Sequence, residues 1–312
     1  MKKFLKYFLR TLISLFIVLN IATAFFAYKF THFNDNGFNV AVSDNSSSWH
    51  TAKTILFDGF SKLKNDVKPD STFQVIYLTT KDNLKLEGWY LKTDSTPKGT
   101  VILFHGHGSN KSAVIDEARE FNEMGYNAFL LDFRAHGGSE GNICTIGYYE
   151  TEDVKLAYDF IQRRGEKNII LWGISLGAAT IIKTVNDSAI QPSKIILEMP
   201  YGSLLQATEG KMRMMHIPAE PLAAMIMFWG GTEQGFWAFN VKPYEYAKKI
   251  NCPVLLQWGK NDKRVSKEEI DAIYNNIHSP KQLVIYDSCG HESLCDKEND
   301  KWELSVSNFL MQ

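Results

Sequence analysis

The sequence predicts an α/β domain with a mostly parallel central sheet and helices on both faces. Short apolar runs of strand length recur along the chain, and helical stretches alternate with them after the first two. Connections of that kind cross over the sheet and leave successive strands parallel. The composition agrees, because 45% apolar and 22% charged residues are typical of a globular chain. No repeat with a period of about 20 to 50 residues is present, which excludes a repeat architecture.

Eight apolar runs are predicted to form strands, and five segments are predicted to form helices. The strands are expected at 73–78, 84–91, 101–104, 128–133, 169–172, 194–197, 254–258 and 283–286. The helices are expected at 112–123, 148–163, 176–185, 267–274 and 302–310. The fifth strand leads directly into a helix, and that junction carries the strongest chemical signal in the chain.

A G-x-S-x-G pentapeptide joins the fifth expected strand to the helix that follows it. It runs from Gly173 to Gly177, with Ser175 at its centre. Glycines at both ends permit a turn so sharp that larger side chains would collide with it, and the turn leaves the serine strained and exposed. This context predicts a nucleophile elbow. The alternative is a Gly-rich helix start at which the serine only caps backbone N–H groups.

Asp262 and His291 are the predicted partners of the serine. A serine hydroxyl is a weak nucleophile until a base takes its proton and a third group orients that base. Asp262 lies in the turn after the seventh expected strand, and His291 lies in the loop after the eighth. The order serine, acid, histidine is the one that accompanies this type of elbow. Asp287 and Glu292 are the fallback acids.

Two backbone amides are the predicted oxyanion hole. Each such donor contributes roughly 3 to 4 kcal/mol to the stability of a tetrahedral intermediate. One amide is that of Leu176, directly after the nucleophile, and the other is that of His107, in the Gly-rich loop after the third expected strand. The alternative takes His105 and His107 as a pair of zinc ligands. No Asp-His continuation follows them, so no metal site is expected.

Five blocks of sequence together resemble the α/β-hydrolase superfamily, and within it the BEM46-like and S33-peptidase-like serine hydrolases. The blocks are His105 to Gly108, Leu131 to Gly141, the pentapeptide around Ser175, Gly259 to Asp262, and Gly290-His291. Families of this kind cleave esters, amides, thioesters or peptides without a cofactor. The resemblance therefore implies the α/β-hydrolase fold and a hydrolase that needs no cofactor.

Asp132 and Arg134 form a charged D-x-R pair at the end of the fourth expected strand. We interpret the pair, with His136 and the glycines that follow, as a hydrogen-bonded turn that shapes the loop beside the site. The alternative is that Arg134 or His136 faces the substrate cleft.

An insertion at about 200–246 breaks the alternation of strands and helices, and we predict that it is a lid. It is rich in methionine and aromatic residues. Methionine suits adaptable apolar surfaces, which favours an acyl or other apolar substrate group. The alternatives are simple packing of the insertion on the core and a lid that faces a membrane. Pro218, Pro221, Gly230 and Gly231 are expected to divide the insertion into short helices.

The N-terminal segment is predicted to be a membrane anchor. Four basic residues precede an uncharged run of 18 residues from Thr11 to Tyr28. That length is at the lower limit for a spanning helix. The basic end is expected to stay inside, with the catalytic domain on the extracytoplasmic side. The alternative is a signal peptide that is cleaved near Ala24, which would leave a secreted enzyme.

The chain is thus expected to have three parts. Residues 1–29 are the anchor or signal peptide, residues 30–71 are a spacer and lead-in, and residues 72–312 are the hydrolase domain. The polar stretch 34–48 is interpreted as the spacer between membrane and domain. The net charge of −1 provides no basic patch, so nucleic acid is not an expected partner.

Four cysteines can pair in three ways, and export would permit disulfides. Cys289 and Cys295 flank His291 and are the expected pair, since a bridge there would stiffen the loop that presents the base. The alternative is free thiols.

These residues together predict a serine hydrolase that cleaves an acyl ester of a small molecule through an acyl-enzyme. Ser175 attacks the carbonyl, His291 takes the proton, and Asp262 orients His291. A peptidase or amidase with the same three residues, acting on a peptide, is one alternative. A non-catalytic binding module is another, but the intact serine and histidine disfavour it. A serine at the elbow also disfavours epoxide hydrolases and dehalogenases, which need a carboxylate there.

Overall fold

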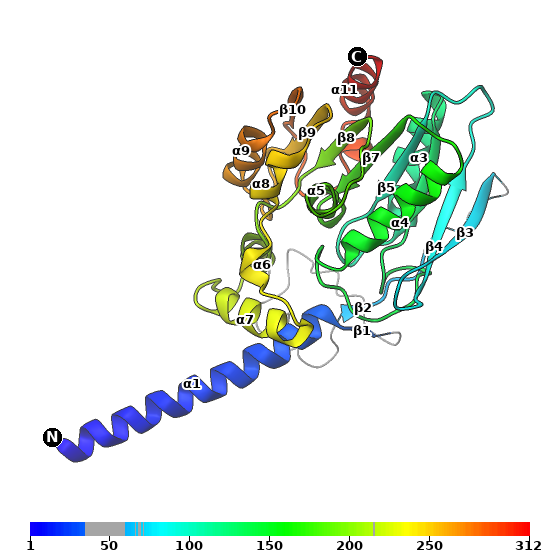
Figure 1. The fold of residues 1–312 in the computed structure, drawn as a ribbon. Helices are drawn as coiled ribbons and strands as arrows, with labels where there is room; N and C mark the ends of the chain where they lie inside the picture. The colour runs from blue at the N-terminus through cyan, green and yellow to red at the C-terminus, as the bar shows by residue number, and fades with distance from the viewer. Residues whose placement is uncertain (35–59, 66, 68–69, 71, 215) are drawn as a thin grey trace.

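Eight strands form one mixed sheet at the centre of the molecule (Figure 1). The structure is a computed structural model, and it describes residues 1–34, 60–65, 67, 70, 72–214 and 216–312. The strands are β3 (Phe73–Thr79), β4 (Lys85–Leu91), β5 (Thr100–Phe104), β6 (Asn127–Leu131), β7 (Ile169–Ile174), β8 (Lys194–Glu198), β9 (Val254–Gly259) and β10 (Lys281–Tyr286). Their order across the sheet is β10-β9-β8-β7-β5-β6-β4-β3. The β3–β4 and β4–β6 pairs are antiparallel and the other pairs are parallel, which confirms the predicted α/β fold.

Helices cover both faces of the sheet, as predicted (Figure 1). On one face α4 (Glu150–Arg163) packs against α5 (Leu176–Asp187), which also contacts α8 (Pro243–Tyr246). On the other face α3 (Ile115–Glu123) contacts α10 (Leu294–Lys297), and α10 packs on α11 (Asn299–Met311). The remaining helix of the sheet region is α9 (Lys267–Asn276). Because both faces are covered, β5, β6 and β9 are buried along their whole length and consist almost entirely of apolar residues.

The predicted elements differ from the structure by three residues or fewer at their ends, and two of these differences have a clear physical cause. The strand expected at 128–133 stops at Leu131, because Asp132 begins a turn in which its carboxylate accepts hydrogen bonds. The helix expected at 112–123 starts with a 3-10 turn, η1 (Lys111–Val114), which the side chain of Asn110 caps.

The insertion between β8 and β9 contains α6 (Leu204–Met214), α7 (Leu222–Gln234) and a short 3-10 turn, η2 (Ala238–Asn240), and it ends with α8 and a second 3-10 turn, η3 (Ala247–Lys249). Pro218 and Pro221 lie between α6 and α7, as expected. The expectation that Gly230 and Gly231 break a helix is wrong, since both lie inside α7. A Cβ atom on Gly231 would be 2.6 Å from the carbonyl oxygen of Phe236, so this glycine permits a close approach of two chain segments.

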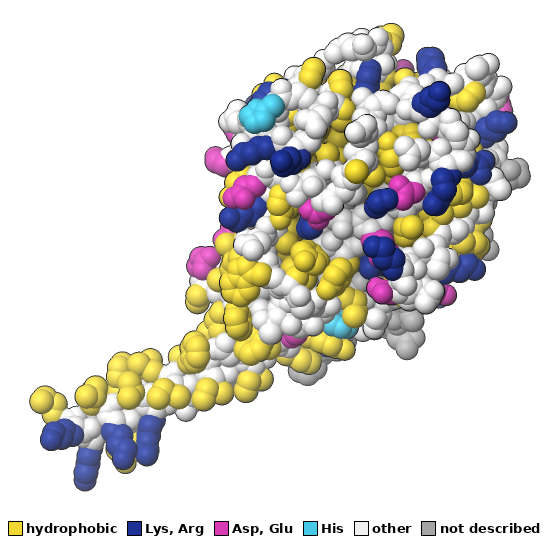
Figure 2. All heavy atoms as spheres, in the orientation of Figure 1, with side chains coloured by type: hydrophobic (Ala, Val, Ile, Leu, Met, Phe, Trp, Pro, Cys, Tyr) yellow, Lys and Arg dark blue, Asp and Glu magenta, His cyan; other side chains and the backbone are white. Residues whose placement is uncertain are grey.

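The N-terminal helix α1 (Lys2–Thr31) projects from the domain and packs on α7 with its C-terminal part (Figure 1). Its projecting surface is apolar and its tip is basic (Figure 2). It is long and apolar enough to be a membrane span or a signal peptide. Its buried residues, Thr23, Ala27, Phe30 and Thr31, lie toward its end.

The chain directly after the predicted anchor packs against the domain that contains the sheet. Phe30 and Phe33 belong to the main core cluster, and β1 (Phe33–Asn34) pairs with the short strand β2 (Phe60–Ser61). The segment predicted as a spacer therefore begins with buried residues. The polar stretch 34–48, apart from Asn34, lies outside the described residues.

Candidate active site

Ser175 occupies a strained turn between β7 and α5. Its backbone angles are φ 53° and ψ −109°, which a side chain other than glycine rarely adopts. A Cβ atom on Gly177 would lie 2.2 Å from the carbonyl oxygen of Phe104, so the second glycine of the pentapeptide is required by contact with β5. The side chain of Ser175 makes no capping hydrogen bond to α5. The pentapeptide thus forms the sharp elbow expected of it, and the helix-capping alternative is wrong.

The structure brings His291 and Asp262 to the serine in a single chain of hydrogen bonds. His291 Nε2 is 2.9 Å from Ser175 Oγ, and His291 Nδ1 is 2.7 Å from Asp262 Oδ2. With Nδ1–H donating to the carboxylate, Nε2 is left to accept the serine proton. The other oxygen of Asp262 accepts from the amides of Arg264 (2.7 Å) and Val265 (2.9 Å), which fixes the carboxylate.

The three side chains meet because β7, β9 and β10 end at the same edge of the sheet. The loops after neighbouring parallel strands share an edge, so residues far apart in the sequence come together there. Neither fallback acid takes part. Asp287 is exposed and pairs with Lys260, and Glu292 accepts from the amide of Gly290.

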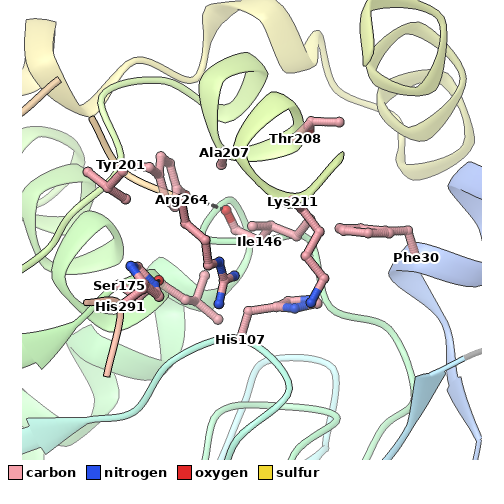
Figure 3. A pocket seen from close by; sticks show the side chains of 12 residues that line it. Phe30, His107, Ile146, Ser175, Tyr201, Ala207, Thr208, Lys211, Arg264 and His291 are labelled. Carbon is pink, nitrogen blue, oxygen red and sulfur yellow. Dashed lines mark hydrogen bonds between the residues drawn. The ribbon is translucent and has the colours of Figure 1, made fainter. Parts of the chain in front are cut away.

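The two predicted oxyanion donors flank the serine. Leu176 is the first residue of α5, and the first amides of a helix have no acceptor within it. His107 lies in the loop after β5, and it lines the same cavity as Ser175, Leu176 and His291 (Figure 3). The amide of Gly108 donates to His136 Nε2 (3.2 Å), which holds that loop in position.

His105 does not join His107 as a metal ligand. Its ring is buried, Nε2 accepts from the amide of Phe133 (3.2 Å), and Nδ1 donates to the carbonyl of Gly106 (2.8 Å). The ring of His107 instead stacks on Phe30, with ring centroids 5.6 Å apart. Both nitrogens of His105 are therefore committed to the protein.

The D-x-R pair is structural, as predicted. Asp132 accepts from the amides of Lys111 and Gly138, both at 2.7 Å, and forms an ion pair with the Lys111 ammonium. Arg134 pairs with the carboxylates of Asp153 and Glu152. Neither residue lines the cavity at the serine.

Among the lining residues of this cavity that the sequence did not predict, three bear on its chemistry. Phe30 comes from the end of α1, Lys211 from α6, and Arg264 from the loop after β9 (Figure 3). Arg264 lies two residues after Asp262 in the sequence, and this closeness to the predicted acid could have identified it as a residue of the site. No local pattern connects Phe30 or Lys211 with the serine, because their segments meet it only in the folded chain.

Burial and positive charge control the ionisation of the site. Burial and the Arg264 guanidinium lower the pKa of His291, and the Asp262 carboxylate opposes them. Burial, reinforced by the charge of Arg264, lowers the pKa of Lys211 to about 7. Burial also lowers the pKa of Arg264. The neutral imidazole that a general base requires is thus favoured.

The expected disulfide between Cys289 and Cys295 is absent, and all four cysteines are free thiols. The two side chains make separate contacts. Cys289 Sγ lies 3.5 Å from Glu298 Oε1, and Cys295 Sγ accepts from Asn299 Nδ2 at 3.5 Å. The loop of His291 is held by these and other hydrogen bonds rather than by a covalent bridge.

Comparisons with known proteins agree with this fold. The family model described as serine aminopeptidase, S33, matches residues 95–226, and the dienelactone hydrolase family model matches residues 208–307. The uncharacterized protein YqkD of Bacillus subtilis is 24% identical over 229 residues, which cover 72% of this chain and 75% of that protein. The uncharacterized protein YfhR of Escherichia coli is 23% identical over 245 residues, covering 76% and 80%.

Solved structures share the fold. The Pyrococcus furiosus esterase Pf2001 superposes with a TM-score of 0.67 at 23% identity, covering 81% of this chain and 98% of that one. Acetyl xylan esterase 1 from Thermoanaerobacterium superposes with a TM-score of 0.57 at 18% identity, covering 78% and 86%. The chain is a member of the α/β-hydrolase superfamily. It is a hydrolase.

Proposed function

We propose that this hydrolase is a membrane-anchored serine esterase that cleaves acyl esters through an acyl-enzyme. The observation that carries the proposal is the hydrogen-bond chain from Ser175 Oγ through His291 to Asp262, with distances of 2.9 and 2.7 Å. It ends at a strained serine that lines a cavity. An oriented base next to such a hydroxyl is what nucleophilic catalysis by serine requires.

The proposed reaction has two stages. His291 Nε2 takes the proton as Ser175 Oγ attacks the ester carbonyl, and the Asp262 carboxylate stabilises the imidazolium that forms. The amides of Leu176 and His107 donate to the oxyanion of the tetrahedral intermediate. His291 then protonates the leaving alcohol as the C–O bond breaks. His291 next takes a proton from water as the water oxygen attacks the acyl carbon, and it returns that proton to Ser175 Oγ as the acyl–Oγ bond breaks and the acid leaves.

A second, apolar cavity supports an acyl substrate. It adjoins the serine cavity, since Phe30, Ile146 and Thr208 line both. It lies between α1, α6 and α7, and Ala27 and Met227 are among its walls. Apolar walls favour a hydrocarbon chain, because each methylene group removed from water contributes about 0.8 kcal/mol. The lid predicted at 200–246 thus provides part of the proposed acyl site.

The contacts of α1 support an anchor that is retained. Trp229 Nε1 donates to Asn20 Oδ1 at 3.2 Å, and Ala27 packs in a cluster with residues of α6 and α7. Phe30 lines the serine cavity. Cleavage near Ala24 would divide this interface. We therefore propose that α1 stays attached and spans the membrane, with the basic tip inside and the catalytic domain on the extracytoplasmic side.

The serine aminopeptidase family match keeps a peptidase as the second candidate. The charge of the cavity favours the esterase. An aminopeptidase substrate presents an α-ammonium group, whose pKa is about 8. Arg264 and Lys211 line the cavity, and their positive charges would repel the α-ammonium group.

The proposal is tested by labelling the full-length protein in detergent with a fluorescent fluorophosphonate, with Ser175→Ala as the control. Wild type should be labelled and the variant should not. p-Nitrophenyl esters of increasing chain length should then be hydrolysed, with a loss in Ser175→Ala of roughly 10⁴-fold or more. A folded wild type that takes no label would refute the esterase. Faster cleavage of aminoacyl p-nitroanilides than of esters would favour the peptidase.

A further inference from the structure

Arg264 places a cation beside the serine. Its side chain lines the cavity shared by Ser175 and His291, and it also lines a second opening to the same pair (Figure 3). Among the described residues, no carboxylate forms an ion pair with its guanidinium. A guanidinium carries five donors and stays charged, so withdrawing it from water without an anion is costly.

Asp262, the described carboxylate that raises the pKa of Arg264, is already committed. Asp262 gives one oxygen to the amides of Arg264 and Val265 and the other to His291. Its charge raises the pKa of Arg264, but burial outweighs that effect and the pKa is lowered. The protein therefore keeps this cation in a place that disfavours its charge.

Lys211 adds a second cation to the same cavity. Its side chain extends from α6 toward the ring of His107, and the guanidinium of Arg264 points into the space beside it (Figure 3). The charge of Arg264 contributes to the lowered pKa of Lys211, as expected of like charges that lie close together. An anion placed between them would relieve this repulsion.

We infer that the substrate carries a fixed negative charge, a carboxylate or a phosphate, which Arg264 binds with the support of Lys211. This inference rests on the proposed esterase function and specifies its substrate class. A guanidinium fork matches both kinds of anion through paired hydrogen bonds. Arg264 and Lys211 line the serine cavity but not the apolar one. The charge therefore belongs to the alcohol half of the ester, and the acyl chain occupies the space beside α1.

Three butyrate esters with matched leaving groups test this inference on the full-length enzyme in detergent. They are the esters of 4-hydroxybenzoate, of 4-hydroxyphenyl phosphate, and of methyl 4-hydroxybenzoate, which is neutral. Wild type should show a kcat/KM at least about tenfold higher for one of the anionic esters, after correction for the alkaline hydrolysis rate of each ester. The preferred anion identifies whether the site takes a carboxylate or a phosphate.

Arg264→Gln and Lys211→Gln should each reduce the ratio of anionic to neutral kcat/KM, and Arg264→Gln should bring it close to one. The matched control is Arg163→Gln, which removes an exposed arginine on α4 and should leave the ratio unchanged.

Fluorophosphonate labelling of each variant reports whether its site is folded. Hydrolysis of all three esters without preference would overturn the inference and leave the esterase standing. A preference that survives in labelled Arg264→Gln would also overturn it. Absence of labelling in wild type would instead refute the esterase itself.

Discussion

Arg134 and Arg264 are arginines of the same domain with opposite surroundings. Arg134 donates to both oxygens of Asp153 and to Glu152. Burial disfavours its charge, but the carboxylates of Asp153, Glu152 and Glu150 together outweigh burial and raise the pKa of Arg134. Arg264 lines the serine cavity, its pKa is lowered, and no described carboxylate pairs with it. The paired charge of Arg134 therefore stabilises the fold, whereas the charge of Arg264 is the one that we propose binds the substrate.

The carboxylates Asp132 and Asp262 differ in the same way. The hydrogen bonds of Asp132 go to Lys111 and to the turn at Gly138, and they end within the protein. Those of Asp262 pass through His291 and end at a serine hydroxyl in a cavity. An aspartate as such therefore does not reveal its role. The group at the end of its hydrogen-bond network distinguishes a structural aspartate from a catalytic one.

The largest expected effect is that of Asp262→Asn on kcat. The amide would hold the imidazole in the wrong tautomer and would not stabilise the imidazolium, so kcat should fall by about 10⁴-fold. Hydrolysis of p-nitrophenyl butyrate measures it. Asp287→Asn is the control, because its carboxylate is exposed and pairs with Lys260. An equal loss in both variants would contradict the assignment of the acid.

Methionine substitutions at the two arginines should affect stability in different ways. Arg134→Met leaves the buried Asp153 without its partner and should lower the free energy of unfolding by about 3 to 5 kcal/mol. Arg264→Met removes a cation with which no described carboxylate pairs, and it should leave the free energy of unfolding unchanged or raise it by up to about 1 kcal/mol. Urea unfolding measures both. A large loss of stability in Arg264→Met would show that this guanidinium also serves the scaffold.

The smallest expected effect is a shift in the pH dependence of kcat/KM for a neutral ester. His291 acts as a base only when neutral, so the rate falls as pH drops through its pKa. Burial and the charges of Arg264 and Lys211 lower that pKa against the opposing charge of Asp262, which puts the acid limb below pH 6.5. Arg264→Gln removes a charge that favours the neutral imidazole, so the limb should move to higher pH. A limb above 6.5 in wild type, or one that stays in place in the variant, would argue against this environment.

Much of the fold and part of the site could be predicted from local sequence. The strands could be predicted because both faces of the sheet are covered, so that each strand is an apolar run. The elbow could be predicted because its close backbone contacts require glycine on either side of the serine. Asp262 and His291 follow from their places after strands. The expected Cys289–Cys295 bridge is wrong, and Gly230 lies inside a helix. The first error concerns the partners of two thiols, and the second concerns a helix that continues through a glycine where it packs near Ala27 of α1. Spacing along the chain encodes neither.

The sequence by itself determined the class of the protein, its sheet and the order of serine, acid and histidine. These depend on backbone conformation and chain order, which neighbouring residues specify. The tertiary structure decided what surrounds the serine. Phe30 from α1, Lys211 from the insertion and Arg264 from the loop after β9 line one cavity. Their contacts arise from the packing of α1 and the insertion over the sheet edge, and burial then sets the charges that these side chains can hold.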